Sequence, residues 1–301
     1  MDLTAGAWRK LPPGFAAGVI RARVEEPPPA RDASTVVLLR DAPAGGVEAY
    51  LLRRKATMRF APKMHVFPGG GVDPTDAQTD VAWSGPPLAE IAHALKAEPP
   101  LARALVCAAV RETFEETGVL LAGSDADSVV DVSGPEWDDE RRALEAHGTS
   151  LATVLASRGL AVRADLVLPW ARWITPVIEP RRYDTRFFVA ALPAGQEPRG
   201  ATSEADRMVW MSPTEALARR EAGDLLMLPP TAFTLGELAA HDTVASVLAA
   251  AHQREISPVM PRIVITGDEA LLLLPHEDGP DAEAYRAAYR EVEGRPAGHE
   301  A

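Results

Sequence analysis

The sequence predicts a mixed α/β protein, and three observations support this class. Two aliphatic runs, 36–40 and 47–54, flank Ala42-Pro43-Ala44-Gly45-Gly46, a pattern typical of two strands joined by a hairpin loop. A longer stretch, 101–117, repeats its apolar residues at helical spacing. Strand-like runs return further along the chain, at 170–176, 185–192 and 207–211. Strands and helices therefore share one chain.

The remaining elements of the first half are predicted from local signals, namely prolines and the spacing of apolar residues. A short amphipathic helix is expected at 88–96, ended by Pro99-Pro100. After the long helix, Val119-Leu120-Leu121 is expected to form a strand. Two further helices are expected at 136–146 and 150–158, where apolar residues gather on one side.

The second half contains three further signals. Ser212 as N-cap, Pro213 at the first helical position and Glu215 two positions later predict a capping box that opens a helix. One helix is expected to follow Leu228-Pro229-Pro230 and to run to about Gln253. A final hairpin is expected over 262–274, turning at Gly267-Asp268.

Composition limits the class of protein. The 301 residues, 47% of them hydrophobic, can bury a sizeable core in one large domain or two modest ones. The formal net charge of -12 argues against a surface that coats nucleic acid. No apolar run approaches the ~18 residues of a membrane span, and the first residues lack the pattern of a signal peptide. We therefore expect a cytoplasmic protein with no nucleic-acid or membrane partner. Its one cysteine, Cys107, excludes an internal disulfide.

Three acids stand close together on the long predicted helix. Glu112, Glu115 and Glu116 occupy positions i, i+3 and i+4, so they share a face about 100° wide. Arg111 is the one neighbouring cation in this stretch, near Glu115 at i+4. An acidic face of this kind is usually just solvated. The alternative is a site for Mg²⁺ or Mn²⁺, because these hard cations prefer carboxylate oxygens.

The neighbouring motifs favour the metal site. Phe67-Pro68-Gly69-Gly70 lies upstream, and Gly118 follows the helix where a terminating glycine is expected. Together with the run from Arg111 to Val119, this resembles the signature of the Nudix hydrolases; only Thr113 stands where that family prefers a larger aliphatic residue. The resemblance implies a Nudix-type α/β/α sandwich with a mixed sheet, enlarged by helical insertions.

The signature is interrupted. Six residues after Gly70 the chain has Asp76 where the family has Glu, and 34 residues separate Asp76 from Arg111. We infer an insertion at 77–104, which is tolerable because loop-closure entropy grows slowly with length. The expected organisation is an N-terminal extension at 1–33, a Nudix domain at 34–240 with a second, helical insertion at 124–165, and a C-terminal extension at 241–301 with a helix and a hairpin.

The interrupted form is similar to one subgroup, the peroxisomal coenzyme A diphosphatases and their bacterial relatives. Further segments carry the same resemblance: Trp173 to Pro176, Arg181 to Phe188, Trp210 to Ala216, and Leu228 to Pro230. The resemblance covers about residues 34–240. It implies hydrolysis of coenzyme A or acyl-CoA to 3′,5′-ADP and 4′-phosphopantetheine or its acyl derivative.

The resemblance also implies roles at the acidic helix. Glu115 and Glu116 are expected to be the main metal ligands, with Glu112 as a third ligand or a water-orienting group. Arg111 is expected to orient the carboxylates.

Gly69 and Gly70 are expected to let the backbone pass close to the substrate, the helix and the metal, with Gly70 contributing to the metal site. For the general base, our hypothesis is Glu204, whose alternative is a solvated acid in a polar loop.

Arginines are the expected contacts of the substrate's phosphates. Arg53 and Arg59 fall at the spacing of the two arginines in the coenzyme A motif, although its Ser-Ala pair is absent and Lys63 replaces its glycine. The alternative for these residues is an ordinary basic strand end. Arg182 is another phosphate-contact hypothesis, and its alternative is a structural turn in which Asp184 pairs with an arginine.

The expected function is thus a Mg²⁺- or Mn²⁺-dependent hydrolase of a small nucleoside diphosphate substrate, acting as a monomer or homodimer. Two alternatives remain at this point. One is a Nudix hydrolase of another dinucleotide, such as NADH or ADP-ribose. The other is a Nudix module that senses a nucleotide without cleaving it, which has no need to retain three metal-binding acids.

Overall fold

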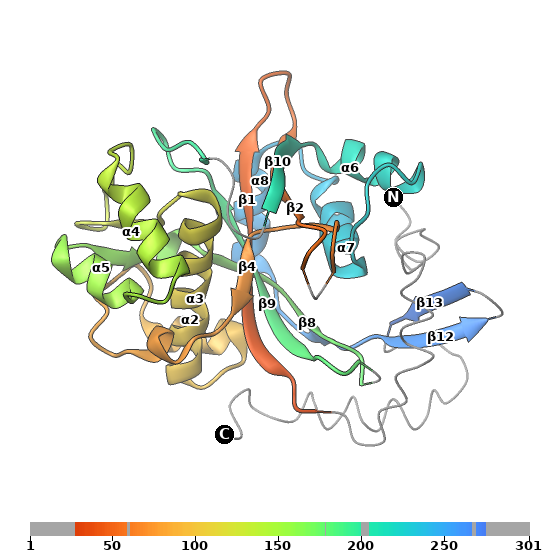
Figure 1. Ribbon diagram of the computed structural model, residues 1–301, viewed down its shortest axis with the longest axis horizontal. Helices are drawn as coiled ribbons and strands as arrows, with labels where there is room; N and C mark the ends of the chain where they lie inside the picture. Colours follow the sequence, from red (N-terminus) through yellow and green to blue (C-terminus); the bar gives the residue numbers. More distant parts are fainter. Residues whose placement is uncertain (1–27, 59–60, 178, 200–204, 267–268, 275–301) are drawn as a thin grey trace.

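The structure of the protein is a computed structural model that describes residues 28–58, 61–177, 179–199, 205–266 and 269–274 (Figure 1). Most of the predicted N-terminal extension and the end of the C-terminal extension lie outside these residues. The part of the extension that is described, from Arg31, belongs to the first strand of the sheet. Within the described ranges, no helix is long and apolar enough to cross a membrane.

The molecule is built on a mixed sheet in which eight strands are described. The main order is β10-β2-β1-β9-β8-β11, while β3 pairs with β2 and β4 with β1. β1 pairs in parallel with β9, and β8 with β11; the other pairings are antiparallel. The strands are β1 (Arg31–Asp41), β2 (Val47–Arg54), β3 (His65–Val66), β4 (Gly69–Gly71), β8 (Leu168–Ile174), β9 (Tyr183–Ala191), β10 (Ala205–Met211) and β11 (Pro258–Val259).

Helices cover both faces of this sheet, so the predicted α/β/α sandwich is confirmed (Figure 1). Successive side chains of β1 point to opposite faces, as the period of a strand requires. Val36 and Leu38 pack into a core with α3 (Pro99–Thr117), and Val37 and Leu39 pack into a second core with the C-terminal helices. Those helices are α6 (Pro213–Glu221), α7 (Pro229–Leu238) and α8 (Val244–Gln253).

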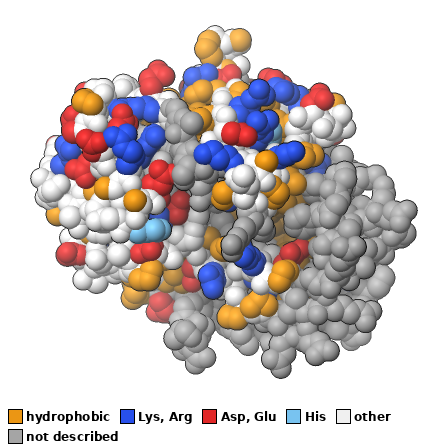
Figure 2. All heavy atoms as spheres, in the orientation of Figure 1, with side chains coloured by type: hydrophobic (Ala, Val, Ile, Leu, Met, Phe, Trp, Pro, Cys, Tyr) orange, Lys and Arg blue, Asp and Glu red, His pale blue; other side chains and the backbone are white. Residues whose placement is uncertain are grey.

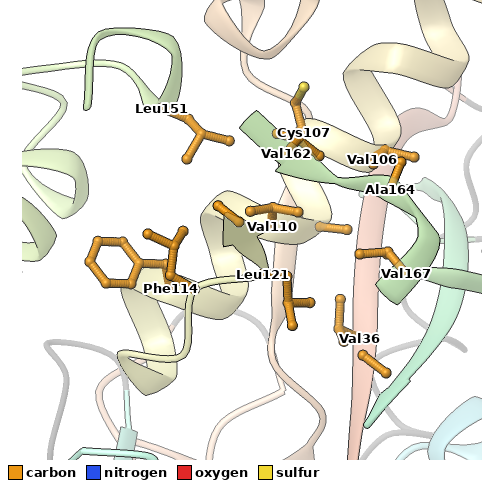
Figure 3. Packing of buried hydrophobic residues seen from close by; sticks show 14 of the residues in the cluster. Val36, Val106, Cys107, Val110, Phe114, Leu121, Leu151, Val162, Ala164 and Val167 are labelled. Atoms are coloured by element: carbon orange, nitrogen blue, oxygen red, sulfur yellow. The ribbon is translucent and has the colours of Figure 1, made fainter. Parts of the chain in front are cut away.

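Helix α3 is buried around most of its circumference (Figure 3). Its side chains Val106, Val110 and Phe114 lie among residues of β1 and of the 124–165 segment, and each such buried side chain contributes about 1.5–3 kcal/mol. The helix begins at Pro99, two residues before the predicted start, because proline is well accommodated at the first helical position. It ends at Thr117, and the following Gly118 caps it with a φ of 75°, which suits glycine.

The two predicted insertions are joined to each other. β5 (Trp83–Ser84) from the first pairs in parallel with β7 (Ala161–Arg163) from the second, and β6 (Ala122–Gly123) completes a three-stranded sheet. The remaining elements of this region are η2 (Pro74–Ala77), α2 (Leu88–Leu95), α4 (Glu136–Glu145), α5 (Leu151–Ser157) and η3 (Ala164–Leu166). The insertions thus form one unit outside α3 (Figure 1).

Two local predictions are wrong. Val119 to Leu121 is a buried connection and not a strand, because the Gln196 side chain takes both backbone hydrogen bonds of Leu120, at 2.9 and 3.0 Å. The single helix predicted up to Gln253 is broken between α7 and α8, where Thr243 caps the start of α8.

Two others are confirmed, the first in part. Ser212 accepts a hydrogen bond from the backbone of Glu215 and caps α6. The reciprocal half of the predicted capping box is not seen among the described residues, where the Glu215 side chain pairs with Arg219. The hairpin forms from β12 (Arg262–Thr266) and β13 (Glu269–Leu273); its turn lies outside the described residues.

Candidate active site

The acids of α3 are not a solvated face. Glu115 and Glu116 are each only 8% exposed, and the side chain of Glu112 is 14% exposed. These carboxylates lie between α3 and the strand β4, so the common interpretation of such a triplet is wrong here. Withdrawing several carboxylates from water is unfavourable unless cations or hydrogen-bond donors face them.

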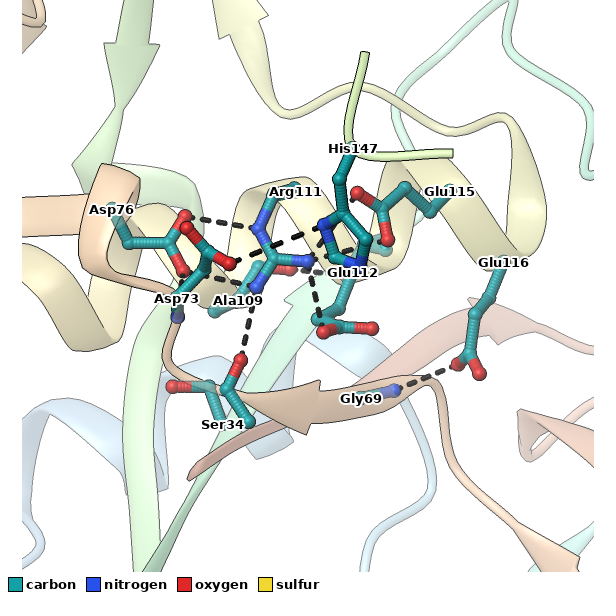
Figure 4. A network of polar contacts seen from close by, with 12 residues as sticks. Ser34, Gly69, Asp73, Asp76, Ala109, Arg111, Glu112, Glu115, Glu116 and His147 are labelled. Atoms are coloured by element: carbon teal, nitrogen blue, oxygen red, sulfur yellow. Dashed lines mark hydrogen bonds and ion pairs between the residues drawn. The ribbon is translucent and has the colours of Figure 1, made fainter. Parts of the chain in front are cut away.

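Arg111 lies at the centre of the acids (Figure 4). Its guanidinium forms two 2.9 Å hydrogen bonds with Asp76 and one of 2.9 Å with the carbonyl of Gly71. Its Nη1 also lies 2.9 Å from Glu112 and 3.2 Å from Glu115. Although burial opposes the charge, these acidic neighbours raise the pKa of Arg111. The guanidinium is thus fully engaged with protein groups, and its orienting role stays a prediction.

Asp76 lies in η2 and not on α3, and its carboxylate holds the guanidinium of Arg111. It is 2% exposed, accepts both hydrogen bonds from Arg111 and also caps η2 by accepting one from the backbone of Asp73. The residue at the position of the family's first acid therefore anchors Arg111 across 35 residues of sequence.

The glycine loop touches the acids directly. The backbone N–H of Gly69 donates a 2.8 Å hydrogen bond to Glu116 Oε2 (Figure 4). A Cβ at Gly70 would lie 2.3 Å from Glu112 Oε1, so only glycine leaves room for this carboxylate. Both glycines belong to β4, which pairs with β1 and is thereby fixed relative to α3.

Burial raises the pKa values of two acids. It raises the pKa of Glu112 to about 7, an effect that Glu115 reinforces and Arg111 opposes. Burial also raises the pKa of Glu115, while Arg111 again acts in the opposite direction. Both shifts come first from burial, and a cation bound beside these carboxylates would lower their pKa values again.

The donor set fits a hard divalent ion. Asp76, Glu112 and Glu115 each pair with the guanidinium of Arg111, and Glu116 accepts from the Gly69 N–H. Oxygen is the ligand atom that Mg²⁺ and Mn²⁺ prefer. In the described part of the chain, no three acidic, histidine or cysteine side chains converge as a ready ion-binding group. The argument for a divalent ion thus rests on the negative charge and the oxygen atoms of these acids, and not on a converged ligand geometry.

Arg53 and Arg182, which were predicted to contact phosphates, pair with other protein groups. Arg53 forms an exposed ion pair with Asp206 at 2.7 Å. Arg182 donates to the backbone carbonyls of Thr175 and Pro28, at 3.1 and 2.9 Å, as in the alternative of a structural turn. Asp184 completes that turn by pairing with Arg172 and Arg186. Arg59 and Glu204 lie outside the described residues.

The surface carries mixed charge. Figure 2 shows basic side chains over the region of β10 and α6, interspersed with acidic ones. Two ion pairs belong to this region, Arg53–Asp206 and Arg219–Glu215. On this face the basic side chains are thus partly paired with acids.

One feature of the site was missed at the sequence level. A cavity of about 410 Å³ opens beside the acids and is bordered by Gly69, Gly70 and Glu112. Arg54, and not the predicted Arg53, lines this cavity. Side chains alternate along β2, so the sequence predicts that these two arginines point to opposite faces of the strand. Which of the two faces the cavity lies on is not predictable from the sequence.

The chain resembles known proteins along most of this architecture. The family model of the NUDT19 Nudix domain matches residues 86–238, just over half of the 301 residues. A solved Nudix hydrolase from Alicyclobacillus acidocaldarius shares 32% sequence identity and a TM-score of 0.63, covering 73% of this chain and 96% of that one.

Two curated relatives are acyl-coenzyme A diphosphatases named NUDT19. The Homo sapiens protein is 27% identical over 284 residues, covering 79% of this chain and 74% of that protein. The Xenopus laevis protein is 25% identical over 230 residues, covering 64% and 59%. The chain spans 54%, 59% and 74% of the length of the first curated relatives it matches. The chain belongs to the Nudix hydrolase family, whose enzymes act on diphosphate bonds, and to the group described by the NUDT19 Nudix domain.

Proposed function

We propose that the protein is a divalent-metal-dependent hydrolase that cleaves the diphosphate of coenzyme A or acyl-CoA. The products are 3′,5′-ADP and 4′-phosphopantetheine or its acyl derivative. The observation that carries the proposal is the buried excess of carboxylates on α3, next to the glycine loop and open to a cavity of ligand size.

In this proposal, Glu112, Glu115, Glu116 and the Gly70 carbonyl hold Mg²⁺ or Mn²⁺. The ion would mask the charge of the diphosphate during attack by water. The protein's own contribution is positioning: Arg111 orients Glu112 and Glu115, and the Gly69 N–H fixes one oxygen of Glu116.

The reaction forms one bond to phosphorus and breaks one. Water attacks a phosphorus atom of the diphosphate, the bond between that phosphorus and the bridging oxygen breaks, and the bridging oxygen leaves with the other phosphate. The proton of the water passes to a general base, for which Glu204 remains our assignment.

The substrate class is supported by the relatives and by the arginines. The Homo sapiens and Xenopus laevis relatives are named acyl-coenzyme A diphosphatases. Arg54 lines the cavity, and in this proposal its guanidinium contacts the diphosphate beside the acids. Arg53 lies one residue earlier on the same strand, on its exposed side, and is our hypothesis for the contact of the terminal phosphate. A cytoplasmic location and a monomeric or homodimeric state stay predictions.

The test is a panel of substrates with the full chain and either Mg²⁺ or Mn²⁺: coenzyme A, acyl-CoA, NADH, ADP-ribose and nucleoside triphosphates. We expect the fastest turnover with coenzyme A or acyl-CoA, and slower turnover of 3′-dephospho-CoA. Preference for NADH or ADP-ribose would overturn the substrate assignment. Absence of turnover on the whole panel would overturn the enzymatic function and favour a nucleotide sensor.

The site is tested by matched substitutions. Glu116→Gln removes one negative charge at the proposed metal site and should lower kcat by about 10² or more, because electrostatic stabilisation there is lost. Glu215→Gln makes the same chemical change on the exposed surface of α6 and should leave kcat unchanged. Equal activity of both variants would contradict the assignment of Glu116.

A further inference from the structure

The cavity beside the acids extends well beyond them. Its volume of about 410 Å³ lies within the range of about 300–1,000 Å³ typical of small-molecule sites. It begins at Gly70 and Glu112 and is also bordered by β8, β9 and the start of α7. The hairpin β12–β13 contributes Ile263 and Leu272 to its wall. Figure 1 shows α7 above β8 and the hairpin β12–β13 to their right.

The wall of the cavity is mostly apolar. Aromatic rings come from Phe67, Trp173 and Phe187, and prolines open α7 at Pro229 and Pro230. Hydrogen-bonding side chains also line the cavity: Arg54, Tyr183, Thr35, Thr175, Thr185 and Thr231. The larger, apolar share of the wall suits a flexible chain of methylene and methyl groups.

Two polar atoms in this wall lack partners. Among the described residues, neither Trp173 Nε1 nor Glu179 Oε1 has a hydrogen-bond partner, although both atoms are buried. Trp173 is only 3% exposed, and both residues line the cavity. Buried polar groups are rarely left unsatisfied, so a donor and an acceptor are available for a ligand.

The pair selects a particular ligand chemistry. An indole N–H can only donate, and a carboxylate can only accept. A secondary amide offers both complements, a carbonyl for Trp173 and an N–H for Glu179. The carboxylate at the same time disfavours a phosphate, because like charges repel at close range.

We propose that this cavity binds the pantetheine arm of the substrate, with the Trp173 indole N–H and the Glu179 carboxylate as its polar contacts and Ile263 and Leu272 as part of its apolar wall. The arm is a chain of methylene and methyl groups that carries two amides and a hydroxyl group. It matches a mostly apolar wall in which one buried donor and one buried acceptor have no partner among the described residues. This inference rests on the proposed function, since it assigns one half of the coenzyme A molecule to a place next to the acids.

The test measures binding of the two halves of coenzyme A separately, by calorimetry on the full chain. Pantetheine is one probe and 3′,5′-ADP is the other. Ile263→Trp narrows the cavity and Glu179→Ala removes the acceptor, and each should weaken pantetheine binding by about tenfold or more. Trp173→Phe keeps an aromatic ring but removes the donor and should weaken it by a smaller factor. The affinity for 3′,5′-ADP should stay unchanged throughout.

A matched control lies one residue along the hairpin. Leu273 adjoins Leu272 but does not line the cavity, because successive strand residues point to opposite faces. Leu273→Trp should therefore leave the affinity for pantetheine unchanged, and thermal unfolding of each variant verifies that it is folded.

Three results would overturn the inference: no pantetheine binding to the wild type, unchanged affinity in both Ile263→Trp and Glu179→Ala, or loss of 3′,5′-ADP binding instead. The last result would place the nucleotide half in the cavity. If the wild type binds pantetheine but hydrolyses no coenzyme A, the proposed function fails while this binding site stands.

Discussion

The contact between Gly70 and Glu112 predicts that one added methyl group at Gly70 lowers the activity strongly and the stability little. In Gly70→Ala, the new Cβ would lie 2.3 Å from Glu112 Oε1, whereas ordinary contact begins at 3.4 Å. The carboxylate must therefore retreat by the difference, about 1.1 Å. A misplacement of about 1 Å at a catalytic group can cost on the order of 100-fold in rate, which corresponds to about 2.7 kcal/mol of activation free energy.

The folded state should tolerate the same substitution. The methyl group meets the end of a flexible side chain, and the φ of Gly70 lies outside the left-handed region. A displaced rotamer of Glu112 costs about 0.5–1.5 kcal/mol. Replacing glycine with alanine recovers about 0.4–1 kcal/mol because the unfolded chain loses conformational freedom. The net change in the free energy of unfolding should be within about 1 kcal/mol.

Gly69→Ala provides the contrast. Its Cβ would lie 2.4 Å from the Ser34 carbonyl oxygen and 2.7 Å from Thr35 Cα, which are backbone atoms of β1. The φ of Gly69 is also unfavourable for alanine, at 156°. We expect this variant to lose about 2 kcal/mol or more of stability, because neither the clash nor the strain can be relieved by a side chain.

The assay is urea unfolding of both variants together with kcat on coenzyme A. A further variant, Gly70→Ala with Glu112→Asp, shortens the acid by one methylene and should recover part of the lost rate. The reasoning is refuted if folded Gly70→Ala keeps kcat within threefold of the wild type, or if it is destabilised as much as Gly69→Ala.

Three further predictions concern groups around the site. Arg111→Ala should destabilise the protein by about 3–5 kcal/mol in urea unfolding, because it leaves buried carboxylates, foremost Asp76, without their cation; a loss below 1 kcal/mol would contradict this. Burial raises the pKa of the Cys107 thiol to about 12, so we expect no reaction with a disulfide reagent at pH 8 until denaturant is added, and stoichiometric labelling of the native protein would disprove it. Burial lowers the pKa of His65, while its contact with the Leu226 carbonyl acts in the opposite direction. Because the unfolded state then binds the proton more readily, the free energy of unfolding should fall as the pH drops below about 6.5. The fall should be smaller in His65→Gln, and an equal fall in the two proteins would rule this out.

The local part of the fold could be predicted from the sequence. Helix α3 follows from the spacing of its apolar residues, and its end follows from Gly118. Strand β2 matches the predicted range 47–54 because the glycine-rich loop before it is a local signal. The acids of α3 could be assigned because a short motif of fixed spacing places them on one face of a helix.

Contacts between distant segments could not be predicted in this way. The pairing of Arg111 with Asp76 depends on how the chain returns after an insertion, and the spacing of the motif alone identifies Asp76 only as a substitute acid. The parallel pairing of β1 with β9 joins residues far apart in sequence and determines which side chains of β9 reach the cavity. Glu179 carries no local signal, since its importance lies in being buried without a partner.

Gln196 shows a further limit of predicting structure from the sequence. It replaces a strand neighbour by hydrogen bonding to both backbone groups of Leu120, across 76 residues. An apolar triplet such as 119–121 has the composition of a strand, yet its backbone is satisfied by a side chain from a distant loop. Periodicity alone does not distinguish these cases.

The pairing of β5 with β7 has a consequence for protein engineering. The two insertions interrupt the chain separately, but the three-stranded sheet makes them one structural module. Deleting 124–165 alone would remove β7 and leave β5 as an unpaired edge, a typical starting point for aggregation. A minimal version of this enzyme, or a chimera with an uninterrupted relative, therefore has to exchange both segments together while keeping Asp76, because the arginine that orders the acids depends on it.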